Sequence, residues 1–259
     1  MHRRQSDKLI YSSVRLQMSS ALITGANRGI GLEFVRQYLK DGWQVYAACR
    51  DPERAEHLQA LAKESGDRLK LLRIDVTNAD EVNAAAERIK GKPLEVLINN
   101  AGVVEPVFYG SGAYEGTDDP DLRTYDYQGW LDVLNTNLLG PARVCGAFVD
   151  NLAAGQRPVA VMMVSTLASI SSTWQAGRYA YRTSKAALNM LTCSAGEWYQ
   201  SRGIILVSIS PGWTQTDMGG PKATNSVDQS VTGVRTVIAN LTAADAGKFF
   251  NFNGEIFPW

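Results

Sequence analysis

The sequence lacks the features that mark membrane, metal-binding and nucleic-acid-binding proteins. Its 259 residues include only three cysteines and no C-x-x-C pair, so neither a disulfide framework nor a zinc site is expected. The longest apolar runs, such as residues 159–164, are far shorter than the roughly 18 to 20 residues of a membrane-spanning helix. With 26 basic and 26 acidic residues, the basic excess that favours phosphate backbones is missing. We expect no metal, no membrane span, no nucleic-acid partner and a cytoplasmic, reducing setting.

The composition that is present fits one folded domain preceded by a short extension. With 45% hydrophobic and 20% charged residues, the chain has enough apolar side chains for a buried core. Residues 1–17 differ, because they carry four basic residues against one acid. They match either a disordered N-terminal extension or a weak organelle presequence, and the missing amphipathic period favours the extension. We expect residues 18–259 to form a single domain.

Short apolar runs alternate with longer segments of helical period from residue 19 onward, which is typical of stacked βαβ units. The sequence therefore predicts an α/β fold with a Rossmann-type, doubly wound parallel sheet in a single domain. Residues 103–127 show little periodicity and predict a long surface loop. The predicted strands cover residues 20–24, 45–49, 69–74, 96–99, 159–165 and 205–210, with an edge strand at 248–252. The predicted helices cover residues 30–40, 52–64, 79–89, 130–151 and 181–199.

A glycine-rich turn joins the first predicted strand to the first predicted helix. Its three glycines follow the spacing G-x-x-x-G-x-G. Glycines let the backbone approach a ligand closely, and a helix N-terminus offers N–H groups and a positive dipole to a phosphate. The alternative is an ordinary turn, but the strand–turn–helix context predicts a dinucleotide pyrophosphate site. This predicted site comprises Gly25, Asn27, Arg28, Gly29, Ile30 and Gly31.

The end of the second predicted strand selects the dinucleotide. An acid there binds the free ribose of NAD, whereas an arginine accommodates the 2′-phosphate of NADP. Here Arg50 follows Cys49, and Arg28 in the glycine-rich turn provides a second cation. Asp51 leaves NAD as the alternative. We expect NADP (NADPH), held by Arg50 and Arg28.

Tyr181 and Lys185 form a candidate acid–base pair. Their i, i+4 spacing at the start of a predicted helix puts both side chains on one face. A nearby ammonium group lowers the pKa of a phenol from about 10, so the tyrosine can transfer a proton near neutral pH. Tyr179 also lies here, but its i+4 residue is the uncharged Thr183.

Five motifs occur in the order found in short-chain dehydrogenases/reductases, and the chain resembles this family over residues 19–259. The motifs are the turn at residues 24–31, Asn99-Asn100-Ala101-Gly102, Asn137, Tyr181-x-x-x-Lys185 and Pro211-Gly212. Residues 179–189 and 211–220 look like the branch of C-factor and sniffer-type carbonyl reductases. The resemblance implies an NADPH-dependent oxidoreductase that reduces a small-molecule carbonyl to an alcohol, or catalyses the reverse.

The resemblance also implies roles for single residues. Tyr181 would donate the proton, Lys185 would lower its pKa and hold the nicotinamide ribose, and Asn137 would anchor a water that relays protons. Further cofactor contacts are implied for Asp75, Val76, Asn99, Ala101, Gly102, Pro211, Gly212 and Thr216.

The catalytic serine has three candidates. The spacing of the sniffer-like branch gives Ser165, the commoner family spacing gives Ser169, and Thr166 can supply a substitute hydroxyl. We favour Ser165, because it ends a buried strand, where ligands of such sheets bind.

The substrate, the oligomeric state and a second function stay open. The segment between Gly102 and Asn137 is longer than usual for the family, and aromatic residues of this and other loops are candidates for a substrate pocket. Relatives include both monomers and homo-oligomers. The alternative function is a nucleotide-binding signalling or scaffold protein with little turnover, which the complete Ser, Asn, Tyr and Lys set disfavours. The aromatic candidates are Tyr109, Tyr114, Trp174 and Trp213.

Overall fold

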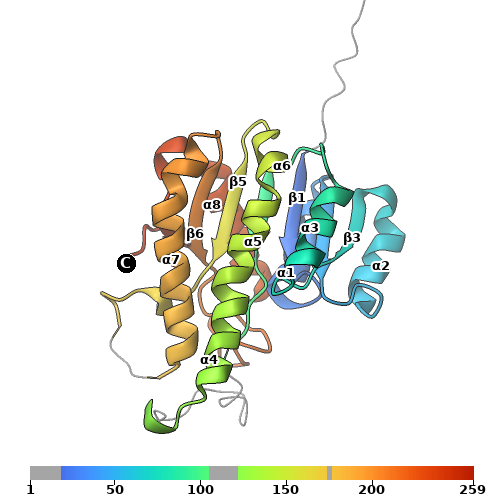
Figure 1. Ribbon diagram of the computed structural model, residues 1–259. Coiled ribbons are helices and arrows are strands. Elements are labelled where there is room, and N and C mark those ends of the chain that lie inside the picture. The colour runs from blue at the N-terminus through green and yellow to red at the C-terminus, as the bar shows by residue number, and fades with distance from the viewer. Residues whose placement is uncertain (1–18, 105–121, 174–176) are drawn as a thin grey trace, which may run out of the picture.

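The computed structural model describes residues 19–104, 122–173 and 177–259, which form one α/β unit (Figure 1). Its seven strands are parallel and follow the order β3-β2-β1-β4-β5-β6-β7. This order confirms the predicted Rossmann-type, doubly wound sheet and its edge strand. The strands are β1 (Ser20–Thr24), β2 (Gln44–Cys49), β3 (Leu69–Arg73), β4 (Val96–Asn99), β5 (Val159–Met163), β6 (Ile205–Ser210) and β7 (Phe249–Asn251). The predicted extension, residues 1–17, and residues 105–121 of the predicted loop lie outside the described residues.

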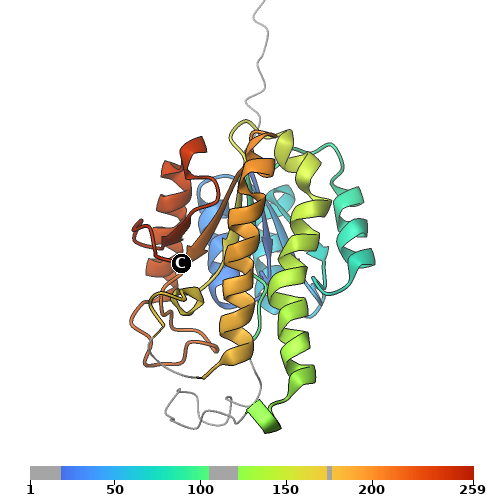
Figure 2. The ribbon, with the colours of Figure 1, turned by 60° about the vertical axis from the view of Figure 1, so that its left-hand side comes forward.

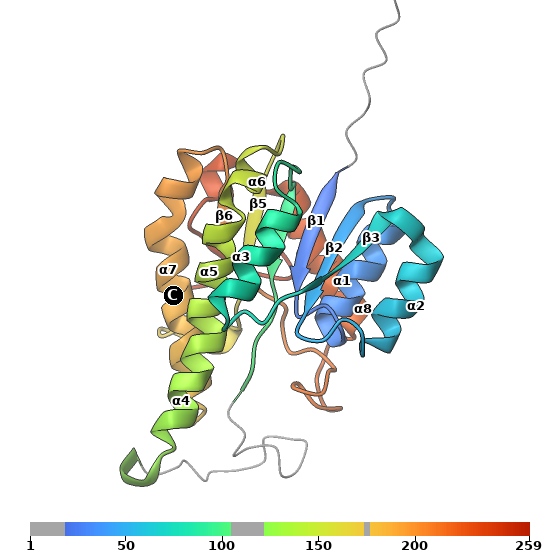
Figure 3. The same ribbon diagram turned by 45° about the vertical axis from the view of Figure 1, so that its right-hand side comes forward.

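Two layers of helices enclose the sheet (Figures 2 and 3). Residues of β1 alternate between them: Ala21 and Ile23 pack with one layer and Leu22 packs with the other, all fully buried. Because both faces of the sheet are covered, β1 is apolar at all three positions. One layer holds α1 (Gly29–Lys40), α2 (Glu56–Ser65) and α8 (Val227–Asn240), and the other holds α3 (Ala79–Arg88), α5 (Gly140–Ala147) and α7 (Tyr179–Gln200). Helix α4 (Tyr127–Leu134) precedes α5, and α6 (Val149–Ala153) follows it.

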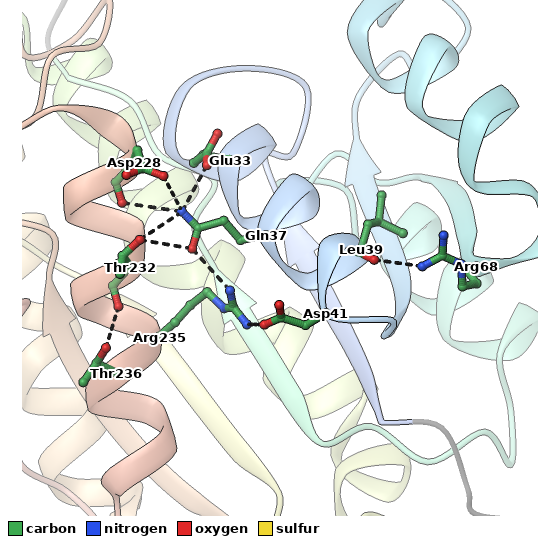
Figure 4. Close-up of polar contacts among 9 residues, drawn as sticks. All are labelled: Glu33, Gln37, Leu39, Asp41, Arg68, Asp228, Thr232, Arg235 and Thr236. Atoms are coloured by element: carbon green, nitrogen blue, oxygen red, sulfur yellow. Dashed lines mark hydrogen bonds and ion pairs between the residues drawn. The ribbon is translucent and has the colours of Figure 1, made fainter.

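Helix α8 is absent from the sequence-based prediction. A capping box starts it, in which the Ser226 hydroxyl accepts from the Gln229 N–H and the Gln229 side chain accepts from the Ser226 N–H. This pattern was a sequence signal for the helix. Figure 4 shows how α8 meets α1: Gln37 Nε2 donates to Asp228 Oδ1 and to Thr232 Oγ1, both at 3.2 Å. These contacts hold α8 against the C-terminal half of α1 in the first helical layer.

The helix predicted over residues 130–151 is present, but it is irregular and Phe148 interrupts it before α6. Helix α4 ends at Leu134, a π-helical turn spans Asn135–Leu139, and α5 begins at Gly140 with a proline in its first turn. A π-helical turn holds one extra residue and often occurs at functional sites. Here it contains the fully buried Asn137, whose side chain bonds to the backbone of Val103. The polar contacts of Asn137 therefore lie at the π-helical turn.

The other predicted elements are present with shifted ends. Helix α2 begins at Glu56 instead of residue 52, and α7 begins at Tyr179, two residues before the predicted start. The two-residue shift of α7 is common at helix ends, whereas residues 52–54 form a bend and a turn before α2. In the described part of the chain, no helix is long and apolar enough to cross a membrane.

Candidate active site

Most of the predicted site residues gather at the edge of the sheet where the parallel strands end. The glycine-rich turn follows β1, Ser165 follows β5 and the segment from Pro211 follows β6. Tyr181 and Lys185 begin α7, which packs against β5 and β6. Ligands of open α/β sheets bind outside these carboxyl ends.

Lys185 is a buried amine at this edge. Only 5% of the residue is exposed, and its Nζ donates to the carbonyl oxygen of Met163 at the end of β5 (2.8 Å). Nζ lies 5.9 Å from the centre of the Tyr181 ring. Burial lowers the pKa of Lys185 to about 8, because desolvation disfavours its charged form. A cation beside a buried phenol is the arrangement that adapts tyrosine to proton transfer near neutral pH.

The lowered pKa of Lys185 predicts a rise in stability at alkaline pH. Below pH about 8 both the folded and the unfolded chain carry this proton, and the folded state bears the full cost of burying the ammonium group. Between about pH 8 and the ordinary lysine pKa of about 10.4, only the unfolded chain still binds the proton. The unfolding free energy should therefore rise with pH across this range, by at most about 3 kcal/mol. Chemical denaturation across this range, compared with Lys185→Met, measures the rise. An identical pH dependence in the two proteins would contradict it.

Asn137 joins the start of α7 to the segment after β4. Its Nδ2 donates to the Val103 carbonyl oxygen and its Oδ1 accepts from the Val103 N–H, both at 2.8 Å, while Nδ2 also donates to Ser184 Oγ (3.0 Å). A Cβ atom placed on Gly102 would lie 3.3 Å from Asn137 Oδ1 and 3.5 Å from Lys185 Nζ. Asn137 and Lys185 therefore converge beside Gly102.

The three candidate hydroxyls after β5 have different surroundings. Ser165 is half-buried, and its Oγ accepts from the Leu167 N–H (3.2 Å), so its own O–H stays available as a donor. Ser169 is 1% exposed, and its Oγ donates to a main-chain oxygen of Trp259 (3.0 Å). Thr166 is half-buried in the 3-10 turn that follows Ser165. Because the Ser169 hydroxyl is already bound to Trp259, Ser165 is favoured for the catalytic role.

The glycine-rich turn is packed too closely for larger residues. A Cβ atom on Gly31 would lie 2.2 Å from the carbonyl oxygen of Gly25, and one on Gly25 would lie 2.9 Å from Ala101 Cα. Gly29 adopts φ +53°, the left-handed region that favours glycine. The backbone itself therefore forms the surface of this turn, and the segment after β4 supports it.

Helix α1 presents its N-terminus at the same place. Arg28 precedes it without a side-chain cap, and no acidic residue stands in its first turn. The first N–H groups of a helix have no partner within the helix and carry the positive end of its dipole. Of the other predicted residues, Asn27 is exposed and Ile30 is half-buried. The arrangement favours a bound anion such as a pyrophosphate.

The two predicted 2′-phosphate ligands differ in their surroundings. Arg50 is exposed directly after β2, while Asp51 accepts from the Arg54 N–H (3.3 Å) and pairs with the Arg54 side chain (3.5 Å). Arg28 forms an ion pair with Asp217 at 2.7 Å, with 72% and 75% of the two side chains exposed. The ion pair engages one terminal nitrogen of Arg28, and the other N–H donors of the guanidinium remain for a phosphate.

The segment after β6 reaches the glycine-rich turn. It begins with Pro211 and Gly212, and a Cβ atom placed on Gly29 would lie 3.4 Å from Thr216 Cγ2. The Thr216 hydroxyl accepts from the Gly219 N–H (3.0 Å), which holds this segment in a compact turn. Thr216 is therefore brought to the site, as predicted from the sequence.

Three predicted cofactor residues have side chains engaged elsewhere. Asn99 is buried and donates to Cys145 Sγ of α5 (3.2 Å), so its side chain lies in the helix–sheet core and only its backbone can reach a cofactor. Asp75 accepts hydrogen bonds from Thr77 N–H and Oγ1 at 2.9 and 2.7 Å. Val76 packs against α5, where a Cβ atom on Gly140 would lie 2.7 Å from its Cγ2. A contact of these three with adenine stays a prediction.

Several residues that support the site were missed. Thr24 Oγ1 accepts from the N–H groups of Asn100 and Ala101, both at 3.1 Å, and Asn100 Nδ2 donates to the Thr24 carbonyl oxygen (3.0 Å). Ser184, which binds Asn137, donates in turn to the main-chain oxygen of Tyr181 (2.7 Å). Thr24, Asn100 and Ser184 each stand next to a predicted residue, and that adjacency was the available signal.

One of the four predicted aromatic pocket residues, Trp213, lies in the described part of the chain. Tyr109, Tyr114 and Trp174 lie outside the described residues, whereas Trp213 is 53% exposed and donates from Nε1 to the Gly219 carbonyl oxygen (2.7 Å). Within residues 19–104, 122–173 and 177–259, no group of three or more His, Cys, Asp or Glu side chains lies together as a metal site would require.

A glycine-rich turn at a helix N-terminus, with a tyrosine–lysine pair at the same sheet edge, defines a dinucleotide-dependent oxidoreductase of the Rossmann class. The family model described as short chain dehydrogenase matches residues 19–226. The chain belongs to the short-chain dehydrogenase family.

Individual relatives agree with this family and with the predicted branch. C-signal of Myxococcus xanthus is 37% identical over 178 residues, which cover 69% of this chain and 100% of that protein. A crystal structure of NADPH-bound carbonyl reductase from chicken fatty liver is 36% identical with a TM-score of 0.79, and the match covers 94% of this chain and all of that one. Carbonyl reductase Sniffer of D. melanogaster is 32% identical with a TM-score of 0.84, covering 93% of this chain and all of that one. The predicted family and branch are confirmed.

Proposed function

We propose that this protein is an NADPH-dependent carbonyl reductase that converts a small-molecule carbonyl to an alcohol, or catalyses the reverse. The observation that carries the proposal is the cluster of Tyr181, Lys185 and Asn137 beside the strand that ends before Ser165. The similarity to NADPH-bound and sniffer-type carbonyl reductases supports the same activity. A scaffold or signalling role with little turnover is not favoured.

The geometry of the glycine-rich turn fits NADPH. Any side chain at Gly31 would collide with the Gly25 carbonyl oxygen, and the N–H groups at the start of α1 favour a pyrophosphate. When bound, NADPH supplies the hydride that reduces the carbonyl carbon. We assign the pyrophosphate to residues 25–31, the 2′-phosphate to Arg50 with Arg28, and the nicotinamide ribose to Tyr181 and Lys185. We assign the remaining contacts to Asp75, Val76, Asn99, Ala101, Gly102, Pro211, Gly212 and Thr216.

Proton transfer falls to Tyr181. Its hydroxyl gives a proton to the carbonyl oxygen during reduction and takes one in the reverse direction. The ammonium of Lys185 stabilises the phenolate that remains, because an opposite charge nearby favours the ionised form. Asn137, held by Val103 and Ser184, would anchor a water that returns the proton through Lys185. Ser165 donates its free O–H to the carbonyl oxygen and polarises the bond.

Arg50 should set the preference for NADPH over NADH. A guanidinium can meet two oxygens of the 2′-phosphate, and a charge-assisted hydrogen bond contributes roughly 1.5 to 3 kcal/mol. Arg50→Ala should therefore raise the Kd for NADPH by about tenfold to a hundredfold and change the Kd for NADH little. Nicotinamide fluorescence titrations of both cofactors measure the two constants, and added salt should erode the wild-type preference.

Arg54→Ala is the matched control for Arg50→Ala, because Arg54 is also an exposed arginine of this segment and pairs with Asp51. It should leave both dissociation constants close to those of the wild type. If the wild type bound NADH as tightly as NADPH, Asp51 would be the residue that selects the ribose.

A panel of aldehydes and ketones, followed by the loss of NADPH absorbance, tests the activity and defines the substrate. Turnover of at least one carbonyl is expected, and binding of NADPH without any turnover would support the scaffold alternative. We further propose a cytoplasmic setting, in keeping with the free cysteines Cys49, Cys145 and Cys193. A homo-oligomer and the absence of nucleic-acid partners stay predictions.

A further inference from the structure

The end of the chain reaches the segment that follows Ser165. Beyond β7 the chain turns back, and the N–H of Phe257 donates to the carbonyl oxygen of Phe249 in β7 (2.8 Å). Figures 1 and 2 both show the marked C end beside the yellow turn that follows β5. A main-chain oxygen of Trp259 accepts from the N–H groups of Ile170 and Ser171. Segments about 90 residues apart in the sequence are therefore joined directly beside the proposed site.

Hydroxyl groups complete this contact. Ser169 Oγ and Ser171 Oγ point to the same Trp259 oxygen at 3.0 and 3.3 Å. Ser169 is almost fully buried, and its Oγ also accepts from the Ser172 N–H (3.1 Å). Four donors from three consecutive residues thus surround one oxygen, and we call this contact the tail clamp. Of the three residues only Ser169 is buried, whereas Ile170 and Ser171 are exposed. The Ser169 hydroxyl is therefore the donor that would lose most without its acceptor.

The tail end of the clamp is fixed to the sheet. Phe249 is fully buried in the α7-side core, and the rings of Phe257 and Trp259 pack against it with centroids 5.3 and 5.8 Å away. Aromatic pairs at these distances stabilise a fold beyond the effect of the apolar area that they bury. The oxygen of Trp259 is therefore held by the sheet itself and can restrain the loop that it binds.

The loop end of the clamp carries the proposed catalytic serine. Ser165 opens a 3-10 turn of only three residues, which closes when Ala168 N–H donates to the Ser165 carbonyl oxygen (2.9 Å) and Ser169 N–H to that of Thr166 (3.1 Å). So short a turn has little stability of its own. At its start the turn is anchored to the sheet, because the N–H of Val164, directly after β5, donates to the Ile209 carbonyl oxygen of β6. At its end the tail clamp holds Ser169.

We propose that Trp259 is a positioning residue, whose main-chain oxygen fixes the loop 169–171 and thereby the direction of the Ser165 hydroxyl. The inference rests on the proposed function. A catalytic group that is displaced by about 1 Å supports a slower reaction although the group is still present. The tail should therefore act on the reduction step and on the fit of the carbonyl, while the glycine-rich turn on the other side of β4 keeps its affinity for NADPH.

Two changes test the tail clamp from its two ends. Truncation after Pro258 removes the accepting oxygen, and the double variant Ser169→Ala with Ser171→Ala removes two of the four donors. Each should lower kcat by about tenfold and leave the Kd for NADPH within about twofold of the wild-type value. Trp259→Phe keeps the main-chain oxygen and an aromatic ring, so it should lose less than the truncated chain.

Hydrogen exchange of the peptide that spans residues 166–173 gives a readout that does not depend on activity. The Ile170 and Ser171 amides should exchange faster in the truncated chain, because they have lost their acceptor. Unchanged exchange would overturn the inference whatever the activity. Wild-type kcat in both the truncated chain and the double variant would also overturn it, and so would NADPH binding that weakens in parallel with kcat. If the wild type reduced no carbonyl at all, the proposed function would fail and the positioning role with it, while exchange would still report the contact.

Discussion

Replacing Tyr181 with phenylalanine should lower kcat by about 10² to 10⁴ and leave the Kd for NADPH nearly unchanged. The substitution removes the hydroxyl that transfers the proton and keeps the buried ring beside Lys185. A phenylalanine ring has no proton to give to the carbonyl oxygen, so the variant lacks the proposed general acid. Steady-state kinetics with a carbonyl from the substrate panel, together with a fluorescence titration of NADPH, separate the two effects.

Tyr179→Phe is the matched control for Tyr181→Phe. The ring of Tyr179 packs against Tyr125, with centroids 5.8 Å apart, and its main-chain oxygen accepts from the Thr183 hydroxyl (2.7 Å). It is therefore part of an aromatic cluster at the start of α7 and has no lysine one turn away. This variant should stay close to wild-type turnover. Near wild-type turnover by Tyr181→Phe would overturn the assignment of Tyr181.

The periodic core of the fold could be predicted from the sequence because local patterns determine it. Strand β5 is a continuous apolar run and β1 has three apolar residues at its centre, and buried strands between two helical layers have that composition. Helix α8 was missed although the sequence carries two signals for it, the capping box of Ser226 and Gln229 and an apolar period at Val227, Val231, Val234 and Ile238. The π-helical turn could not be foreseen, since it depends on contacts of Asn137 with residues 34 and 47 positions away.

The site shows the same division between local and distant contacts. The i, i+4 spacing of Tyr181 and Lys185 predicted their shared face, and the structure has Nζ 5.9 Å from the ring centre. The Met163 carbonyl oxygen that holds Lys185 carries no side-chain signal, so no sequence pattern could reveal it. The predicted cofactor contact of Asn99 named no face of β4, because the motif alone does not give the direction of the side chain. Successive strand residues point to opposite faces, and Asn99 points to the α5 face.

The choice among the hydroxyls after β5 also needed the structure. Spacing alone left Ser165, Thr166 and Ser169 open, because family spacings differ by only a few residues. In the structure Ser169 is buried against Trp259, while Ser165 uses its oxygen as an acceptor and keeps a donor. A group that polarises a carbonyl has to donate a hydrogen bond to its oxygen. Geometry therefore favours Ser165, and kinetics can decide.

Ser165→Ala should lower kcat/KM by about 10² to 10³, which is the usual cost of losing one donor to a developing oxyanion. Ser169→Ala should cost no more than a few-fold, because three of the four donors to Trp259 remain in place. Thr166→Ala tests the substitute hydroxyl and should be equally mild.

The three variants should all keep wild-type affinity for NADPH, since their side chains lie after β5 and away from the glycine-rich turn after β1. Measuring kcat/KM on one carbonyl across the set gives the ranking. A larger loss in Ser169→Ala than in Ser165→Ala would mean that the commoner family spacing applies, and that the buried hydroxyl leaves Trp259 to meet the substrate.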